Sequence, residues 1–322
     1  MRNIIKKTVS FGIACALSLI IISLFVLVYG YTGVHIENDS GATDYKWMPN
    51  QYKATMTEGF AWMKFDSEGF NNTNGILPVD VLIMGSSHME AVNLPSEDNT
   101  GAILNQMLPD MNVYNIGVSG HTIYQCANNL RNAISEYSSA VYVIIETDTV
   151  YLENDRMIAV LDGTLKHIPS YTSGIVFLIQ RYCPAIKSIY KHLEDWRSAE
   201  SRGGEAASVE MTTDEAILDR FLSKISSDAD GRKIIIVYHP LTNIDSNGEL
   251  IADPSGADLF RKCCFNNGIA FVDMTNDFQY LYDTRHILSH GFTNTAVGVG
   301  HLNSYGHKAI AERLAEMIME DQ

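Results

Sequence analysis

The pattern of apolar and polar positions changes twice along the chain. An apolar run without charge extends from Val9 to Tyr29, directly after a short basic start. Residues 31–75 are polar and aromatic, and from Val79 onward short apolar runs alternate with amphipathic stretches of helical length. The pattern therefore predicts three parts, which are residues 1–30, residues 31–75 and residues 76–322.

The last part shows the alternation that is typical of a parallel sheet with helices on both faces. Apolar residues recur at helical spacing in the intervening stretches, for example at Ile123, Ala127 and Leu130. Five apolar runs predict the strands: Val79 to Met84, Val113 to Ile116, Ala140 to Ile145, Lys233 to Tyr238 and Ile269 to Val272. We therefore expect an α/β fold, a flavodoxin-like three-layer α/β/α sandwich with a parallel sheet of about five strands.

The first apolar run has the length of a transmembrane helix, since about 20 residues at ~1.5 Å each cross a ~30 Å hydrocarbon core. The cations before it, which include Lys6 and Lys7, should stay in the cytoplasm, so the rest of the chain should lie outside it. A cleaved signal peptide is the alternative, but its apolar core is usually only about 7 to 15 residues long. We expect an uncleaved signal anchor and a single-pass protein of the cell membrane with an extracytoplasmic domain.

Residues 31–75 contain large aromatic side chains that would be costly to leave in water, namely Trp47, Phe60, Trp62 and Phe70. This composition predicts a juxtamembrane segment that packs on the domain rather than a free stalk.

Charge and cysteine content exclude some classes of protein. The formal net charge of −15 opposes binding to phosphate backbones, so a nucleic-acid partner is not expected. Five cysteines are too few for a disulfide framework in a domain of this size, and no C-x-x-C or Cys/His ligand spacing occurs. The sequence thus indicates no structural metal.

Candidate chemistry begins where the first predicted strand ends, at Gly85-Ser86-Ser87. In open α/β sheets ligands bind at the carboxyl ends of the strands, although serine and glycine are also ordinary helix-entry residues. The second strand ends in a turn containing Gly117 and Gly120, whose main-chain N–H groups could approach a ligand closely or could simply form a tight turn.

His301 lies in the loop before the last amphipathic stretch, within Gly300-His301-Leu302-Asn303-Ser304-Tyr305-Gly306-His307. A histidine there can lean over the rim of the sheet. Because a hydroxyl becomes a good nucleophile only when a base takes its proton, Ser87 and His301 form the expected pair.

These three segments, in this order, resemble the SGNH/GDSL hydrolase family over about 245 residues, from Ile76 to the C-terminus. The resemblance implies that Ser87 is the nucleophile, with Ser86 in place of the usual Asp, and that His301 is the catalytic base. It also implies an oxyanion hole formed by the N–H groups of Ser87 and Gly120.

Two positions depart from the family pattern. The usual Asp three residues before the histidine is Gly298 here, so His301 is oriented by a main-chain carbonyl, by another acid such as Asp273 or Asp277, or by nothing, as in a Ser/His dyad. The third block lacks the usual oxyanion Asn, for which the hydroxyl of Thr147 or Thr149 is a substitute.

Three further histidines are candidates to line the pocket: His88, His239 and His290. The resemblance implies a serine esterase that acts on O-acyl groups, most plausibly O-acetyl, and that needs no cofactor. The predicted topology favours a cell-envelope or secreted glycan as the substrate. The alternatives are a glycan O-acetyltransferase that uses the same residues, with a membrane-bound acyl donor as partner, and a non-catalytic glycan-binding or scaffold protein.

Overall fold

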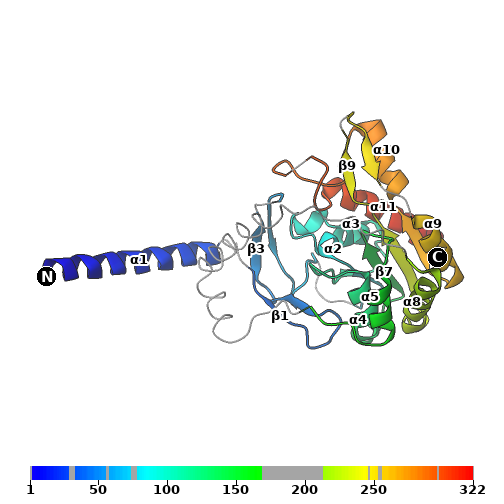
Figure 1. Cartoon of the computed structure of the whole chain (residues 1–322), viewed down its shortest axis with the longest axis horizontal. Helices are drawn as coiled ribbons and strands as arrows, with labels where there is room; N and C mark the ends of the chain where they lie inside the picture. Colours follow the sequence, from blue (N-terminus) through cyan, green and yellow to red (C-terminus); the bar gives the residue numbers. More distant parts are fainter. Residues whose placement is uncertain are drawn as a thin grey trace.

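The computed structural model describes residues 2–28, 33–55, 58–73, 78–168, 213–245, 247–252, 256–295 and 297–321. Helix α1 (Arg2–Val28) contains an apolar stretch, Asn3–Phe25, that is long enough to cross a membrane. Figure 1 shows α1 extending away from the other elements. Most of its large apolar side chains are exposed. The predicted N-terminal apolar helix is confirmed, and its place in a membrane stays a prediction.

A five-stranded sheet forms the centre of the domain, and all its neighbouring strands are parallel. Its spatial order is β11-β8-β7-β5-β6. Counted along the chain, this is the flavodoxin-like order 2-1-3-4-5. The predicted fold class is therefore confirmed. The strands are β5 (Val81–Met84), β6 (Val113–Asn115), β7 (Tyr142–Thr147), β8 (Lys233–Tyr238) and β11 (Ala270–Asp273).

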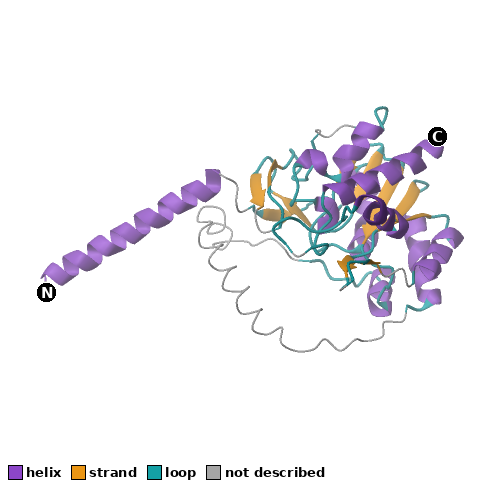
Figure 2. Cartoon of the chain, turned by 90° about the horizontal axis from the view of Figure 1, so that it is seen from above, coloured by secondary structure: helices purple, strands orange, loops and turns teal. Residues whose placement is uncertain are grey.

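Helices cover both faces of this sheet (Figure 2). One face packs against α4 (Ile123–Glu136), α5 (Asn154–Leu161), α8 (Glu215–Asp228) and α9 (Ala257–Asn266). The other packs against α3 (Thr100–Met107), α10 (Thr275–Arg285) and α11 (Ser304–Glu320).

The side chains of β5 show why the sequence predicts this arrangement. Leu82 and Met84 belong to the first core, whereas Val81 and Ile83 belong to the second. Successive side chains of a strand point to opposite faces, so a strand covered on both sides must be apolar at every position. The short uninterrupted apolar runs of the sequence are these doubly covered strands.

The remaining elements are short and were not predicted. They include two antiparallel hairpins before the sheet, formed by β1 (His35–Glu37) with β2 (Tyr45–Trp47) and by β3 (Tyr52–Thr55) with β4 (Ala61–Lys64). A third pairs β9 (Thr242–Ile244) with β10 (Leu250–Ala252). The turns α2 (Ser87–Glu90) and η1 (Ser96–Asp98) complete the set. Strands of three or four residues are too short to show a clear alternation.

Side chains of residues 33–55 and 58–73 contact the domain. Trp47 is buried and its indole N–H donates to Glu90 at 2.7 Å, and Phe70 is buried as well. The prediction is wrong for Phe60 and Trp62, which are 68% and 45% exposed because the alternate positions of β4 face the interior. The predicted boundary between residues 75 and 76 lies outside the described residues.

Candidate active site

Ser87 is the first residue of the short turn α2, two residues beyond Gly85 at the end of β5. The Ser86 side chain caps this turn by accepting the main-chain N–H of His88 at 3.1 Å. A side chain at Gly85 would meet the carboxylate of Glu146 at 2.6 Å, so the tight approach of β5 to β7 requires glycine there. This geometry presents the Ser87 hydroxyl at the rim between two neighbouring strands, β5 and β7, where the strand order reverses.

The structure brings His301 to this hydroxyl. The Nε2 atom of His301 lies 2.9 Å from Oγ of Ser87, although the two residues are far apart in the sequence. The loop that carries His301 is held by its main chain, because the N–H of Gly291 donates to the carbonyl of His301 at 3.0 Å. The predicted pair is thus in hydrogen-bonding contact.

A third side chain, Glu58, completes a chain of hydrogen bonds. One carboxylate oxygen of Glu58 lies 2.7 Å from Nδ1 of His301, and the other accepts the main-chain N–H of His301 at 2.6 Å. An ionised carboxylate only accepts hydrogen bonds, so the ring proton sits on Nδ1 and the lone pair of Nε2 faces Ser87. The arrangement Glu58–His301–Ser87 has the connectivity of a Ser-His-acid triad.

This acid differs from those that the sequence analysis considered. Asp273 accepts hydrogen bonds from Thr275 and pairs with Arg261 at 2.7 Å. Asp277 lies on α10, and burial raises the pKa of its carboxyl group. Neither carboxylate contacts His301, and a dyad without an acid is also wrong. The acid that orients His301 is Glu58, which lies between β3 and β4 and outside the motifs that carry the resemblance.

Glycines and an asparagine hold Glu58 in place. The Asn294 side chain accepts the N–H of Gly59 at 2.8 Å and donates to its carbonyl at 3.2 Å. Gly59 has φ +71°, and a side chain there would meet the carbonyl of Asn93 at 2.6 Å. At Gly300, a side chain would lie 2.3 Å from the Glu58 carboxylate. The loop before α11 thus both carries His301 and leaves room for its acid.

Glu146, at the position of the third block, is a second functional candidate that the sequence analysis missed. It is buried and accepts the main-chain N–H of Ser86 at 2.6 Å and its hydroxyl at 3.2 Å. It also lies 2.7 Å from Nε2 of His239. This carboxylate therefore fixes the turn that carries the nucleophile.

The hydroxyl proton of Thr147 already has an acceptor in the main chain, so it is not free for an oxyanion. Its hydroxyl donates to the carbonyl of Thr149 at 2.8 Å, and the Thr149 hydroxyl donates to the carbonyl of Tyr151 at 3.3 Å. A hydroxyl has only one proton to donate, so the structure contradicts both threonines as oxyanion donors.

The two glycines after β6 differ in a way that the sequence did not indicate. At Gly117 a side chain would collide with Met89 and with the main chain of Glu90 at 2.7 Å, whereas at Gly120 it would meet only the hydroxyl of Tyr45, at 3.9 Å. Gly120 instead has φ +81°, which favours glycine for its backbone conformation. Gly117 is therefore the position with less space.

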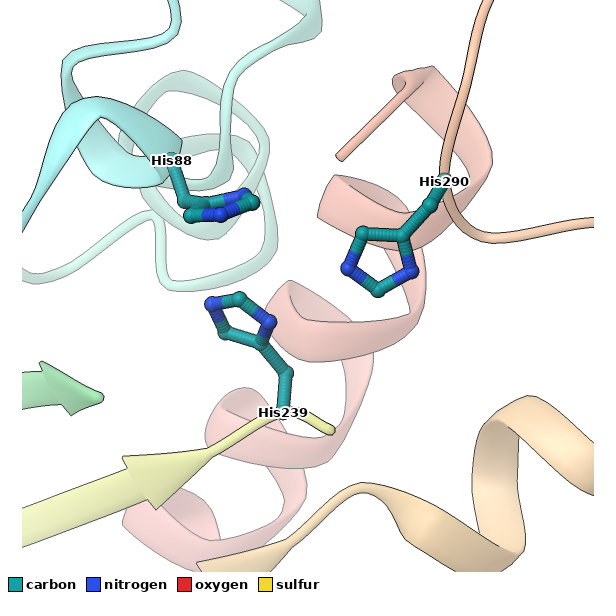
Figure 3. Close-up of side chains that lie close together, drawn as sticks. All are labelled: His88, His239 and His290. Carbon is teal, nitrogen blue, oxygen red and sulfur yellow. The ribbon is translucent and has the colours of Figure 1, made fainter. Parts of the chain in front are cut away.

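The pocket candidates His88, His239 and His290 come together in one cluster (Figure 3). The ring of His88 lies 5.1 Å from that of His301, between centroids. Burial lowers the pKa of His88 well below its usual range and lowers that of His290 to about 3, so these rings are neutral. They therefore offer lone pairs and N–H groups, but no positive charge.

No protein-family model matches this sequence, and no curated protein matches it. Among solved structures, an acetyl xylan esterase is 13% identical, with a TM-score of 0.44 over 74% of this chain and 100% of its own. A lipolytic protein of the G-D-S-L family from Veillonella parvula is 12% identical, with a TM-score of 0.40 over 75% of this chain and 98% of its own.

A psychrotrophic esterase from Pseudoalteromonas is 12% identical, with a TM-score of 0.40 over 75% of this chain and 97% of its own. Similarity this low says nothing further about the chemistry of this chain, which depends on its own side chains.

Proposed function

We propose that this protein is a serine esterase in which Ser87, His301 and Glu58 form the catalytic triad. The hydrogen-bonded chain from the Ser87 hydroxyl through His301 to the Glu58 carboxylate, with distances of 2.9 and 2.7 Å, carries this proposal. A scaffold protein without catalysis would not need a serine, a histidine tautomer and an acid aligned in this way.

In the first half of the reaction, Oγ of Ser87 attacks the ester carbonyl while His301 Nε2 takes the hydroxyl proton. Glu58 accepts the Nδ1–H bond throughout and stabilises the positive ring that forms. His301 then protonates the leaving alcohol, and the acyl group remains on Ser87. In the second half, His301 activates water, which attacks the acyl-enzyme and releases the acid.

The main-chain N–H groups of Ser87 and Gly120 are the proposed oxyanion donors. Ser87 opens the turn α2, whose first N–H groups have no acceptor within the turn. Gly120 is held in its left-handed conformation next to Ser119, whose carbonyl accepts the hydroxyl of Tyr45. Donors preorganised in this way stabilise the charge that develops on the carbonyl oxygen.

The substrate that we propose is an O-acyl group, with acetyl the first choice, on a glycan of the cell envelope. The proposal follows from the N-terminal apolar helix, which would anchor the protein and leave the domain outside the cytoplasm. Acylated polysaccharides are common polymers in that compartment.

The direct test is labelling of the full chain, in detergent micelles, with a fluorophosphonate probe that reacts with activated serines. We expect one labelled serine in the parent and none in Ser87→Ala, with Ser86→Ala as the matched control. Ser86→Ala keeps Oγ of Ser87 but removes the cap of its turn, so it should still be labelled, at a reduced rate. Equal labelling of the parent and Ser87→Ala would contradict the proposal.

A transferase would use the same acyl-enzyme. Release of the aryl alcohol and of free acetate from an aryl acetate, both measured with and without added oligosaccharide, separates the two reactions. We expect equal amounts of aryl alcohol and free acetate without an acceptor. Release of the aryl alcohol only when an acceptor sugar is present, with the acetyl group on the sugar instead of free acetate, would replace the hydrolase by the transferase.

A further inference from the structure

A second group of polar side chains lies beside the triad. His88 follows Ser87, His239 follows β8, and His290 lies in the loop before α11. One ring nitrogen of each lies within 4.8 Å of those of the other two, and Figure 3 shows the rings facing one another. The three residues are only 7%, 0% and 1% exposed.

The hydrogen bonds of His239 decide which nitrogen carries its proton. Its Nε2 lies 2.7 Å from the Glu146 carboxylate, which only accepts hydrogen bonds when ionised, so the proton sits on Nε2. The lone pair is therefore on Nδ1, which is buried and has no hydrogen-bond partner among the described residues.

His290 shows the opposite tautomer. The Thr242 hydroxyl donates its single proton to the carbonyl of Gly298 at 3.1 Å, so it must accept from Nδ1–H of His290, also at 3.1 Å. The lone pair is then on Nε2 of His290, which is again buried and without a partner in the described part of the chain.

Two buried lone pairs that face a common point are costly unless something pairs with them, at about 1 to 3 kcal/mol each. Histidines that bind metals commonly donate their other N–H group to a carboxylate or another fixed acceptor, which orients the ring and sets its tautomer. Glu146 does this for His239, and Thr242 does it for His290.

We propose that His239 through Nδ1, His290 through Nε2 and His88 bind a divalent cation of the zinc class. Neutral imidazole nitrogens suit such ions. Bond lengths of about 2.0–2.1 Å place ligand nitrogens about 3.4 Å apart, whereas the nitrogens here lie within 4.8 Å of one another. The three rings therefore have to approach one another by up to about 1.4 Å.

His88 makes the larger adjustment. Its Nδ1 accepts the main-chain N–H of Leu302 at 3.2 Å, so ligation through Nε2 exchanges the ring tautomer and releases that bond. His239 and His290 therefore form the core of the site, and His88 closes it. The competing occupant is a water molecule, which could donate to the two lone pairs and accept from His88.

The ion would join three segments that position the triad. His88 belongs to the turn of the nucleophile, His239 ends a central strand, and His290 pairs as a β-bridge with Leu302, next to His301. A bound ion would thus hold together the three segments at the rim of the sheet. None of the three histidines belongs to the proposed triad. Ser87→Ala should therefore bind the metal like the parent, whether or not the protein is an esterase.

The test is zinc binding to the full chain in detergent after removal of metals with a chelator. We expect about one equivalent of zinc by elemental analysis, a higher unfolding temperature with zinc, and a tetrahedral cobalt(II) absorption spectrum when cobalt replaces zinc. His239→Gln keeps a donor for Glu146, and His290→Asn keeps one for Thr242, yet each removes a lone pair. Each should weaken binding on the order of 100-fold.

His307→Asn is the matched control, because His307 is another buried histidine whose Nε2 has no hydrogen-bond partner among the described residues and whose Nδ1 accepts the main-chain N–H of Thr100. It should bind zinc like the parent. Absence of stoichiometric binding, or affinity that His239→Gln and His290→Asn leave unchanged, would overturn the proposal in favour of water. If circular dichroism shows that both variants are unfolded, His88→Asn, which keeps an acceptor for Leu302, decides in their place.

Discussion

The five-stranded core and the segment before it, residues 33–55 and 58–73, contribute to the same candidate site by different means. The core positions Ser87 through a parallel ladder and a buried capping turn. The segment has only short hairpins and is attached mainly through side chains, such as Trp47 on Glu90 and Asn72 on the main chain of Asn115. The segment has no clear alternation of apolar and polar residues. Its acid, Glu58, nevertheless lies as close to His301 as Ser87 of the core does.

The two regions should also fail differently when they are changed. The strands of the core are covered on both faces of the sheet, so enlarging or truncating their side chains reduces the free energy of unfolding. Changes near Glu58 should instead reduce activity while the fold persists, since the Glu58 side chain is partly exposed.

The largest expected effect is that of Glu58→Gln. The amide would donate toward His301 Nδ1, which favours the wrong ring tautomer, and a comparable change in a Ser-His-Asp triad lowers kcat by about 10⁴. We expect a loss of this order in aryl acetate hydrolysis, with an unfolding temperature near that of the parent. Glu68→Gln, which removes only a surface ion pair with Lys46 at 3.5 Å, is the control. If Glu58→Gln were as active as the parent, Glu58 would not be part of the catalytic triad.

The second effect concerns stability and pH where the segment meets the core. His121 of the core faces the buried Asp44 of the segment at 3.8 Å. Burial lowers the pKa of His121 to about 4, although the nearby Asp44 raises it. The unfolded chain therefore binds a proton below pH ~6.5 that the folded chain excludes, and the free energy of unfolding should fall by about 3 kcal/mol as the pH drops from 6.5 to 4.

Urea titrations at several pH values measure this slope. His121→Asn should reduce the slope by this contribution, because the buried His88 and His290, whose pKa values are also lowered, remain. His167→Asn, an exposed histidine that also contacts Asp44 at 3.0 Å, should change it much less. An unchanged slope in His121→Asn would show that this contact does not control the acid stability.

The third effect tests the space around the acid. A methyl group at Gly300 would lie 2.3 Å from the Glu58 carboxylate, so Gly300→Ala should displace the acid and lower kcat by about 10², in keeping with the cost of small misplacements. Gly298→Ala is the control, since its methyl group would make ordinary contacts at 3.4 Å and both glycines have positive φ. Equal loss in the two variants would assign the effect to the backbone rather than to Glu58.

The smallest effect is expected for Asn294→Ala, which removes both hydrogen bonds to Gly59 and leaves the carboxylate itself intact. We expect about a tenfold loss of kcat, because one or two neutral hydrogen bonds contribute about 1 kcal/mol each. Asn243→Ala, an exposed position of β9, serves as the control. A loss as large as that of Glu58→Gln would mean that Asn294 itself touches the reacting groups.

The sequence by itself determined the sheet, because burial on both faces imposes a local pattern. Each predicted strand agrees with the structure to within two residues at either end. It also indicated Ser87 and His301, because each stands in a short motif next to a strand end or a helix start. The packing of the loop that carries His301 then brings the two side chains to 2.9 Å.

Only the tertiary structure decided the rest. Glu58 lies between two short strands with no motif around it, and Glu146 looks like the end of an apolar run. His88, His239 and His290 are far apart in the sequence, so no ligand spacing reveals their cluster. Hydrogen bonds join side chains over about 3 Å. Which side chains come that close depends on how distant segments pack, not on their neighbours in the chain.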